Sequence, residues 1–283
     1  MPGRPARELR CPNPRVNPVV SEPMDSAFRF AAIGAVTAVL FSASPVAGQS
    51  GPSAAQSTAS QSTDNSRPNL QGIWQAVNTA AWDIQDHSAQ WGVPAGQGVV
   101  EGNEVPYQPW ALAQKQENYE NRATADPEAQ CGMPGVPRIT YMPYPFQILQ
   151  FDDRVLILYE YIHVTRTIYM DASPHPEGHI DFWMGDSRGH WEGDTLVVDV
   201  IHFNDKTWFD RAGNFHSEQL HVTERFTPSG PDHLTYEATI EDPKVFTRPW
   251  KMSMPLYRRQ EADIQLLEYE CYAYAEHELA QDK

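Results

Sequence analysis

Residues 233–241, with the sequence HLTYEATIE, show the clearest alternation of apolar and polar side chains in the chain. The apolar residues of this stretch all share one parity: Leu234, Tyr236, Ala238 and Ile240. Successive side chains of a β-strand point to opposite faces of the sheet, so the alternation predicts a strand with one buried face. The stretch indicates that the folded part of the chain is built from β-strands.

Outward from this stretch, further short runs of apolar, β-branched and aromatic residues lie between clusters of Pro, Gly and Asp. These runs predict strands over residues 70–77, 146–151, 154–170, 180–184, 195–203, 219–227, 250–256 and 264–272. Only residues 110–122, which follow Pro109, have the composition of a helix. About nine strands joined by tight connections predict an antiparallel barrel or sandwich, and a barrel is favoured because it leaves no exposed edge.

The composition limits the classes of function that the chain can have. The 283 residues are 41% hydrophobic and 20% charged, which is enough apolar material for a packed core. With 21 Lys and Arg against 37 Asp and Glu, the formal charge is −16, and such a surface repels phosphate backbones and anionic lipid. We therefore expect no nucleic-acid partner. The glycine-rich, Gly-Lys-Ser/Thr and Cys-x-x-Cys-His motifs of nucleotide and haem sites do not occur, so nucleotide and c-type haem chemistry are set aside. No cofactor is required by the remaining chemistry, and its identity stays open to a divalent metal.

The first 48 residues look like an upstream extension followed by a signal peptide. Arg29 precedes an apolar run over residues 30–43, and Val46-Ala47-Gly48 fits a signal-peptidase site. The run is short for a transmembrane helix, which needs about 20 residues, although an uncleaved anchor is the alternative. We expect Met24 to be the true start and the protein to be periplasmic or secreted, with no stable membrane insertion after cleavage.

Three consecutive parts are therefore expected along the chain. Residues 1–48 are the extension and signal peptide, residues 49–68 are a flexible polar leader, and residues 69–283 are a single β-barrel domain. Removal of the first part leaves Cys131 and Cys271, which we expect to form a disulfide in an exported chain. Two separate buried thiols are the alternative.

The expected first strand carries Gly72-Ile73-Trp74, which resembles the Gly-x-Trp that opens the first strand of lipocalins and other calycins. A wider set of motifs, spanning about residues 69–272, resembles a large group of exported, mostly uncharacterised bacterial proteins. The motifs are NLQGIWQ, CGMPGVPR, GHWEGDTLVVDV, DRAGNFHSEQLHVTERF and EDPKVFTRPW. The resemblance implies a lipocalin-like (calycin) barrel and export, and it brings no catalytic mechanism.

The segment 203–226 concentrates groups that can transfer protons. A turn at Gly213-Asn214 would let Asp210 face His216, and a carboxylate beside an imidazole fixes its tautomer and raises its basicity. His221 begins a strand on which His221, Thr223 and Arg225 share one polar face, and such a face could line a wet cavity. Solvent contact or a structural hydrogen-bond network is the alternative for this polar face.

Two charged residues interrupt the apolar parity of residues 154–170. Glu160 and Arg166 share that parity, and buried charges must be paired or must serve a site. The alternatives are a structural bridge between the two, or a turn between them that shifts the parity.

Two nearby segments are expected to be loops. His175 and His179 have an i, i+4 spacing, but Pro176 and Gly178 argue against a helical zinc motif. We expect this pair to be surface-loop histidines. Residues 186–194 are also expected to form a loop. Ser187 in this segment lacks the Gly-x-Ser-x-Gly setting of a serine hydrolase.

The predicted function is an exported small-molecule enzyme of lyase, isomerase or hydrolase type acting on a partly apolar substrate by acid–base catalysis. His216 and His221 would transfer protons, Asp210 would orient an imidazole, and Glu160 with Arg166 would position the substrate. A divalent metal held by several histidines is a variant. The main alternative is a non-catalytic lipocalin-like carrier, which would show an apolar cup with few polar anchors. A module of an envelope assembly is the third possibility and would need a large exposed apolar patch.

Overall fold

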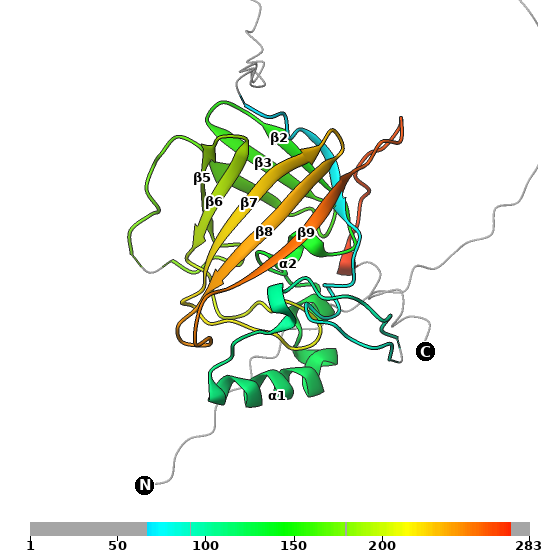
Figure 1. The fold of residues 1–283 in the computed structure, drawn as a ribbon, viewed down its shortest axis with the longest axis vertical. Helices are drawn as coiled ribbons and strands as arrows, with labels where there is room; N and C mark the ends of the chain where they lie inside the picture. The colour runs from blue at the N-terminus through cyan, green and yellow to red at the C-terminus, as the bar shows by residue number, and fades with distance from the viewer. Residues whose placement is uncertain (1–66, 91, 179, 273–283) are drawn as a thin grey trace, which may run out of the picture. The chain divides into compact units, whose positions relative to one another are not determined.

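The computed structural model describes residues 67–272 except 91 and 179 (Figure 1). The predicted signal peptide, its cleavage near Gly48 and the leader up to residue 66 lie outside the described residues, as does His179.

Nine strands form one closed barrel in which neighbours in sequence are neighbours in the sheet, and β9 closes on β1 (Figure 1). The strands are β1 (Gly72–Ala76), β2 (Phe146–Gln150), β3 (Arg154–Tyr159), β4 (Thr165–Tyr169), β5 (Asp186–Glu192), β6 (Thr195–Ile201), β7 (His221–Gly230), β8 (His233–Glu241) and β9 (Trp250–Arg258). The fold is mainly β, which confirms the predicted lipocalin-like barrel.

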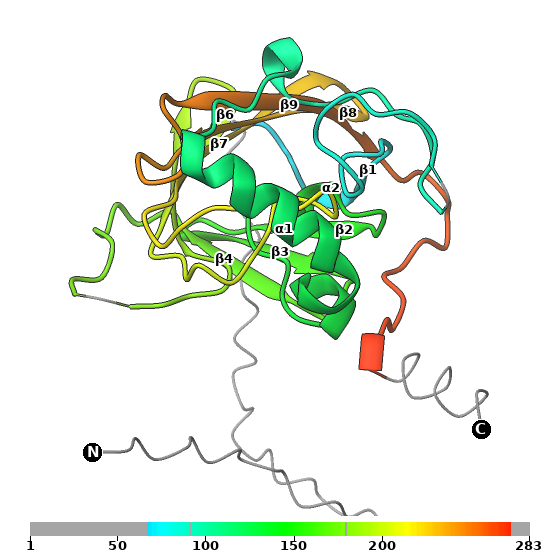
Figure 2. The same cartoon turned by 90° about the horizontal axis from the view of Figure 1, so that it is seen from below.

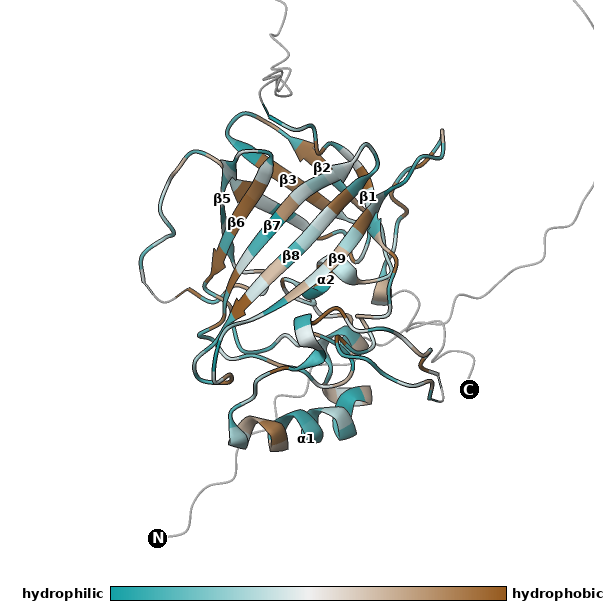
Figure 3. Ribbon diagram, in the orientation of Figure 1, coloured by the Kyte–Doolittle hydropathy of each residue, from teal (hydrophilic) through white to brown (hydrophobic). Residues whose placement is uncertain are grey.

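The stretch with the clearest alternation is β8, and it pairs with β7 and β9 along most of its length. All four of its apolar side chains are buried in the barrel interior, at 1% exposure or less. On the other side of β7, the strand β6 is mostly apolar, and both of its faces are largely covered (Figure 3).

One strand pair departs from the expected antiparallel arrangement. β4 and β5 run parallel, with Ile168 opposite Ser187 and Tyr169 opposite Arg188. A parallel pair cannot be joined by a tight hairpin, so residues 170–185 form a long crossover between the two strands. Residues 180–184, expected as a strand, lie in this crossover and contribute only an isolated bridge between Phe182 and Phe203.

The expected strand over 154–170 is two strands, β3 and β4, separated by a turn at residues 160–164. Ile162 and His163 in this turn have φ angles of 43° and 53°. The turn shifts the parity of the buried side chains, from the odd-numbered residues of β3 to the even-numbered residues of β4. Of the alternatives for Glu160 and Arg166, the shift confirms the turn between them, and the two residues do not lie on one strand face.

The segment 186–192, expected as a loop, is β5. Its sequence obscured the strand because Asp186, Arg188 and His190 lie on the outer face and Gly189 on the inner one. A Cβ atom on Gly189 would approach Met170 Sδ to 2.5 Å, so glycine allows the close contact with β4 and the residues that follow it.

The helical elements lie at one end of the barrel (Figure 2). The helix α1 (Pro109–Ala125) extends across this end, somewhat longer than the predicted 110–122, and α2 (Arg138–Tyr141) is a single turn. Two short 3₁₀ turns are η1 (Glu101–Asn103) and η2 (Pro127–Gln130). None of the helices in the described residues is long and apolar enough to cross a membrane.

The predicted disulfide between Cys131 and Cys271 is confirmed, with a Cα–Cα distance of 5.4 Å. It joins the segment after η2 to the C-terminal segment 259–272, which follows β9. That segment, expected to contain a strand over 264–272, contributes only an isolated bridge between Tyr161 and Tyr269. The disulfide holds this irregular segment beside the helical end of the barrel.

Candidate functional site

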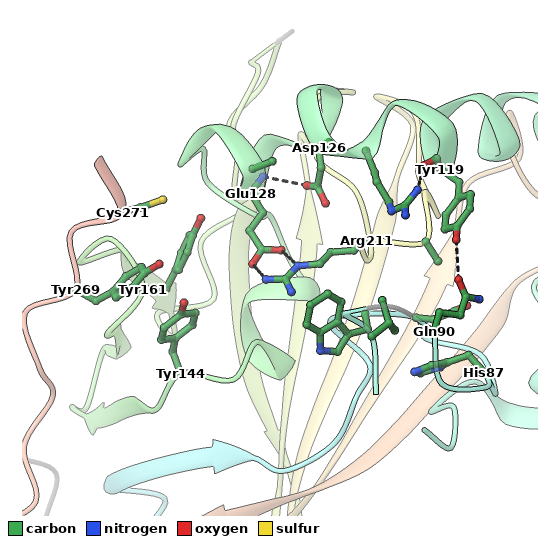
Figure 4. A pocket seen from close by; sticks show the side chains of 17 residues that line it. His87, Gln90, Tyr119, Asp126, Glu128, Tyr144, Tyr161, Arg211, Tyr269 and Cys271 are labelled. Carbon is green, nitrogen blue, oxygen red and sulfur yellow. Dashed lines mark hydrogen bonds and ion pairs between the residues drawn. The ribbon is translucent and has the colours of Figure 1, made fainter. Parts of the chain in front are cut away.

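A cavity of about 420 Å³ lies between α1, the segment after β1 and the C-terminal segment (Figure 4). We call it the aromatic cavity. Its walls are formed by Trp82, Asp83, His87, Gln90, Val93, Tyr119, Arg122, Ala123, Asp126, Glu128, Ala129, Tyr144, Tyr161, Arg211, Ala212, Tyr269 and Cys271. The volume falls within the range of small-molecule sites, and aromatic walls with a few polar groups are typical of them.

Arg211 is held rigidly in the middle of the cavity. Its guanidinium lies 4.0 Å from the centre of the Trp82 ring, and its Nε and Nη2 atoms donate to Glu128 at 2.9 and 2.5 Å. Glu128 also accepts from the fully buried Arg138, which in turn binds Asp126 through two hydrogen bonds. Burial alone would raise the pKa of Glu128, but the hydrogen bonds and charges of the two arginines hold it below its usual range.

Three tyrosines form the opposite wall (Figure 4). The ring of Tyr144 lies 5.4 Å from that of Tyr161 and 4.6 Å from that of Tyr269. Burial raises the pKa of Tyr144 and of Tyr161, so both phenols are neutral at physiological pH. Tyr269 reaches this wall because the disulfide and the bridge to Tyr161 hold the C-terminal segment here.

An imidazole and a carboxylate also line the cavity. His87 Nδ1 lies 2.8 Å from the Gln85 carbonyl oxygen and therefore donates to it, which leaves Nε2 as an acceptor. This Nε2 atom is buried and has no hydrogen-bond partner among the described residues. Burial raises the pKa of Asp83. Neither residue was among the predicted site residues. His87 was missed because it lies outside the run of clustered histidines.

Asp210 is fully buried and organises the turn that follows it. Its carboxylate accepts from the backbone N–H groups of Ile84, Ala212 and Asn214 at 2.9–3.1 Å, and from the Asn214 side chain at 2.5 Å. Burial raises its pKa to about 7. All of these contacts are structural, and the expected contact with His216 is not formed.

His216 is buried beneath the barrel end, away from the aromatic cavity. Its Nε2 atom lies 2.6 Å from Thr207 Oγ1 and its Nδ1 atom 2.9 Å from the Ser217 carbonyl oxygen. The rings of Phe203 and Phe209 pack on it, and burial lowers its pKa. Both ring nitrogens have a hydrogen-bond partner, and this imidazole does not line the aromatic cavity.

Arg166 and Glu160 are not partners. Arg166 lies inside the barrel, where it forms a two-bond ion pair with Glu224 and donates through Nε to Ser187 Oγ at 3.0 Å. The Tyr236 hydroxyl donates to the same carboxylate at 2.8 Å. Glu160 is the first residue of the turn between β3 and β4, and its carboxylate accepts from the backbone N–H of Leu267 at 2.8 Å. Arg166 therefore belongs to a buried polar cluster and Glu160 to the anchoring of the C-terminal segment.

His221 forms an imidazole–carboxylate contact with a residue that was not among the predicted site residues. Its Nε2 atom lies 2.5 Å from Asp199 Oδ1 on the outer face of the barrel. The other oxygen of Asp199 lies 2.8 Å from His175 Nε2, and His175 Nδ1 lies 2.6 Å from Asp186. His175 comes from the β4–β5 crossover, so the supposed surface-loop histidine fixes that crossover to the sheet.

A recess of about 300 Å³ adjoins His221. It is lined by Ile180, Asp181, Ile201, His202, Phe203, Glu218, Gln219, Leu220 and His221. The hydrogen bond with Asp199 raises the pKa of His221 and lowers that of the carboxylate. Across the described residues, no three His, Cys, Asp or Glu side chains are grouped so as to hold a metal ion.

The five predicted site residues thus lie in separate places rather than in one pocket. No protein-family model matches the chain, and a search of curated proteins found no match. The assignment of function therefore rests on the geometry of the two concave sites.

Proposed function

We propose that this protein binds a small, partly apolar molecule with a planar ring in the aromatic cavity. The observation that carries the proposal is the pair of facing walls, the three tyrosines on one side and the rigid Trp82–Arg211 stack on the other. An aromatic ring between such walls is stabilised because its apolar surface is removed from water and because it contacts other rings. The disulfide supports the further proposal that the protein is exported, as in the calycin-like group that its motifs resemble.

Fluorescence of the neutral probe N-phenyl-1-naphthylamine tests this proposal. Ala123 and Ala125 lie on the same helix and are both exposed, but only Ala123 lines the cavity. We expect one saturable site in the native chain, loss of binding in Ala123→Trp and unchanged binding in Ala125→Trp. Equal binding by the two variants, or no saturable binding by the native chain, would contradict the proposal.

Acid–base catalysis is the second candidate function, because the His221–Asp199 contact borders a recess. The contact with Asp199 directs Nε2 toward the carboxylate and leaves Nδ1 of the neutral ring as a base. Cleavage of p-nitrophenyl acetate measured against pH would test it. We expect a rate that depends on a group with a pKa above 6.5, is lost in His221→Ala and is retained in His190→Ala, whose imidazole is more exposed. Identical profiles for the two variants would exclude catalysis by His221.

A further inference from the structure

The aromatic cavity contains two arginines that are immobilised in the same manner. Arg122 lies with its guanidinium 4.1 Å from the Tyr119 ring centre, and its Nη1 donates to the Tyr119 carbonyl oxygen at 2.6 Å. Arg211 lies over Trp82 and is bound by Glu128, as described above. Each guanidinium is thus stacked on a ring and fixed by hydrogen bonds. Side chains fixed in this way lose little conformational entropy when a ligand binds.

Both arginines keep unused donors. A guanidinium has five N–H donors in one plane. Arg211 Nη1, and the Nε and Nη2 atoms of Arg122, form no hydrogen bond to any residue that the structure describes. Neither side chain is buried, and both line the cavity. The cavity therefore presents two fixed cationic groups whose remaining N–H donors can bind an acceptor on a ligand.

The acidic residues of the walls do not offset these donors. Asp126 and Glu128 are already bound by Arg138 and Arg211. Asp83 is the remaining carboxylate among the described lining residues, and its burial opposes the charged form. The protein's own cations also cover one face of Trp82 and of Tyr119, so these faces are not available to a cationic ligand.

We propose that the ligand of the aromatic cavity is a planar aromatic acid. Its ring packs against the tyrosine wall, and its carboxylate or sulfonate accepts hydrogen bonds from Arg211 and Arg122. Charge-assisted hydrogen bonds to a planar guanidinium suit such an oxyanion better than they suit a neutral hydroxyl. This inference rests on the proposed function, since it names the class of molecule that occupies the same cavity.

Three probes with one ring system separate charge from shape. Calorimetric titration of the full chain with 2-naphthoate, 2-naphthalenemethanol and 2-naphthylmethylammonium gives three dissociation constants. We expect the acid to bind about tenfold more tightly than the alcohol, which corresponds to one or two partly exposed charge-assisted hydrogen bonds. The ammonium compound should bind most weakly.

Arginine variants identify the recognising groups. In Arg122→Gln and Arg211→Gln the advantage of the acid over the alcohol should shrink to within about threefold, while the affinity for the alcohol is unchanged. Arg248→Gln, at an exposed position outside the cavity, should keep the native ratio. Arg211→Gln also removes a partner of Glu128 and can impair folding. Arg122 contacts no carboxylate in the described structure, so its variant keeps the test decisive.

The outcomes distinguish the two proposals. Equal binding of acid and alcohol at a site blocked by Ala123→Trp would overturn the inference and leave the proposed function intact. Tightest binding of the ammonium compound would also overturn the inference. Absence of binding by all three probes would overturn the proposed function and, with it, the inference.

Discussion

His221 Nε2 lies 2.5 Å from Asp199 Oδ1 on the outer face of neighbouring strands β7 and β6. The contact raises the pKa of the imidazole above its ordinary 6.5 and lowers that of the carboxylate below its ordinary 3.8. Each shift means that the charged form is favoured by folding. The pair therefore contributes its full stabilisation between about pH 3.8 and pH 6.5. The contribution disappears as the pH rises through the raised pKa of His221, or falls through the lowered pKa of Asp199.

Comparison of the native chain with His221→Gln at several pH values tests this dependence. The difference in free energy of unfolding should be largest near pH 5 and should shrink at pH 9, where the imidazole is neutral. Urea unfolding followed by circular dichroism measures it. The expectation fails if the difference is the same at both pH values.

The buried pair of Arg166 and Glu224 should be among the most sensitive sites of the barrel. Replacement of one partner leaves an uncompensated charge in the interior, so Glu224→Leu should cost about 3–5 kcal/mol of unfolding free energy. The exposed pair of Lys244 and Glu218 is the matched control, and Glu218→Leu should cost less than about 1 kcal/mol. Urea unfolding of the two variants decides the matter, and similar costs would refute the expectation.

His216→Ala should destabilise the protein without affecting the aromatic cavity. The substitution leaves a hole between Phe203 and Phe209 and removes the partner of Thr207, which together cost about 2–4 kcal/mol. Thermal unfolding should show the loss, while N-phenyl-1-naphthylamine binding persists below the melting temperature. A normal melting temperature combined with lost binding or turnover would restore a functional role for this imidazole.

The disulfide should support one wall of the aromatic cavity. None of residues 259–272 is buried, so little apolar packing holds this segment in place. Replacement of Cys131 and Cys271 by Ser should release Tyr269 from the wall, weaken probe binding and increase amide exchange at Leu267, whose N–H is bound by Glu160. In the chain-entropy model the bridge, which spans 140 residues, contributes up to about 5 kcal/mol.

The same experiment has a defined control and a contrary outcome. Cys11 lies outside the described residues, and Cys11→Ser alone should leave binding unchanged. Undiminished probe affinity and unchanged amide exchange in the double variant would show that the segment is held without the bridge.

Local pattern alone was sufficient for several elements. The parity of residues 233–241 predicted both the strand β8 and its buried face, and Pro109 marked the start of α1 within one residue. Only Cys131 and Cys271 follow the expected signal peptide, and this predicted the disulfide between them. These predictions succeed because strand alternation, helix initiation and the scarcity of cysteine are properties of short segments or of composition.

The site was less predictable because each partner is distant in sequence. His221 was predicted to transfer protons, but its carboxylate partner, Asp199 on the preceding strand, was not predicted. The predicted contact between Asp210 and His216 is not formed. Arg166 was identified as a buried charge, but its partner is Glu224, 58 residues away. Strand alternation assigns a side chain to a face, and only the register between strands determines which side chains then meet.

By itself, the amino-acid sequence determined that this chain is built mainly from β-strands and that Cys131 and Cys271 pair, because those features follow from local periodicity and from composition. Only the tertiary structure decided where the turn at residues 160–164 reverses parity, that β4 and β5 pair in parallel, and which segments enclose the aromatic cavity. Trp82, Arg122, Tyr161 and Tyr269 come from four separate segments. A cavity of this kind is formed by long-range packing, and no single segment carries its pattern.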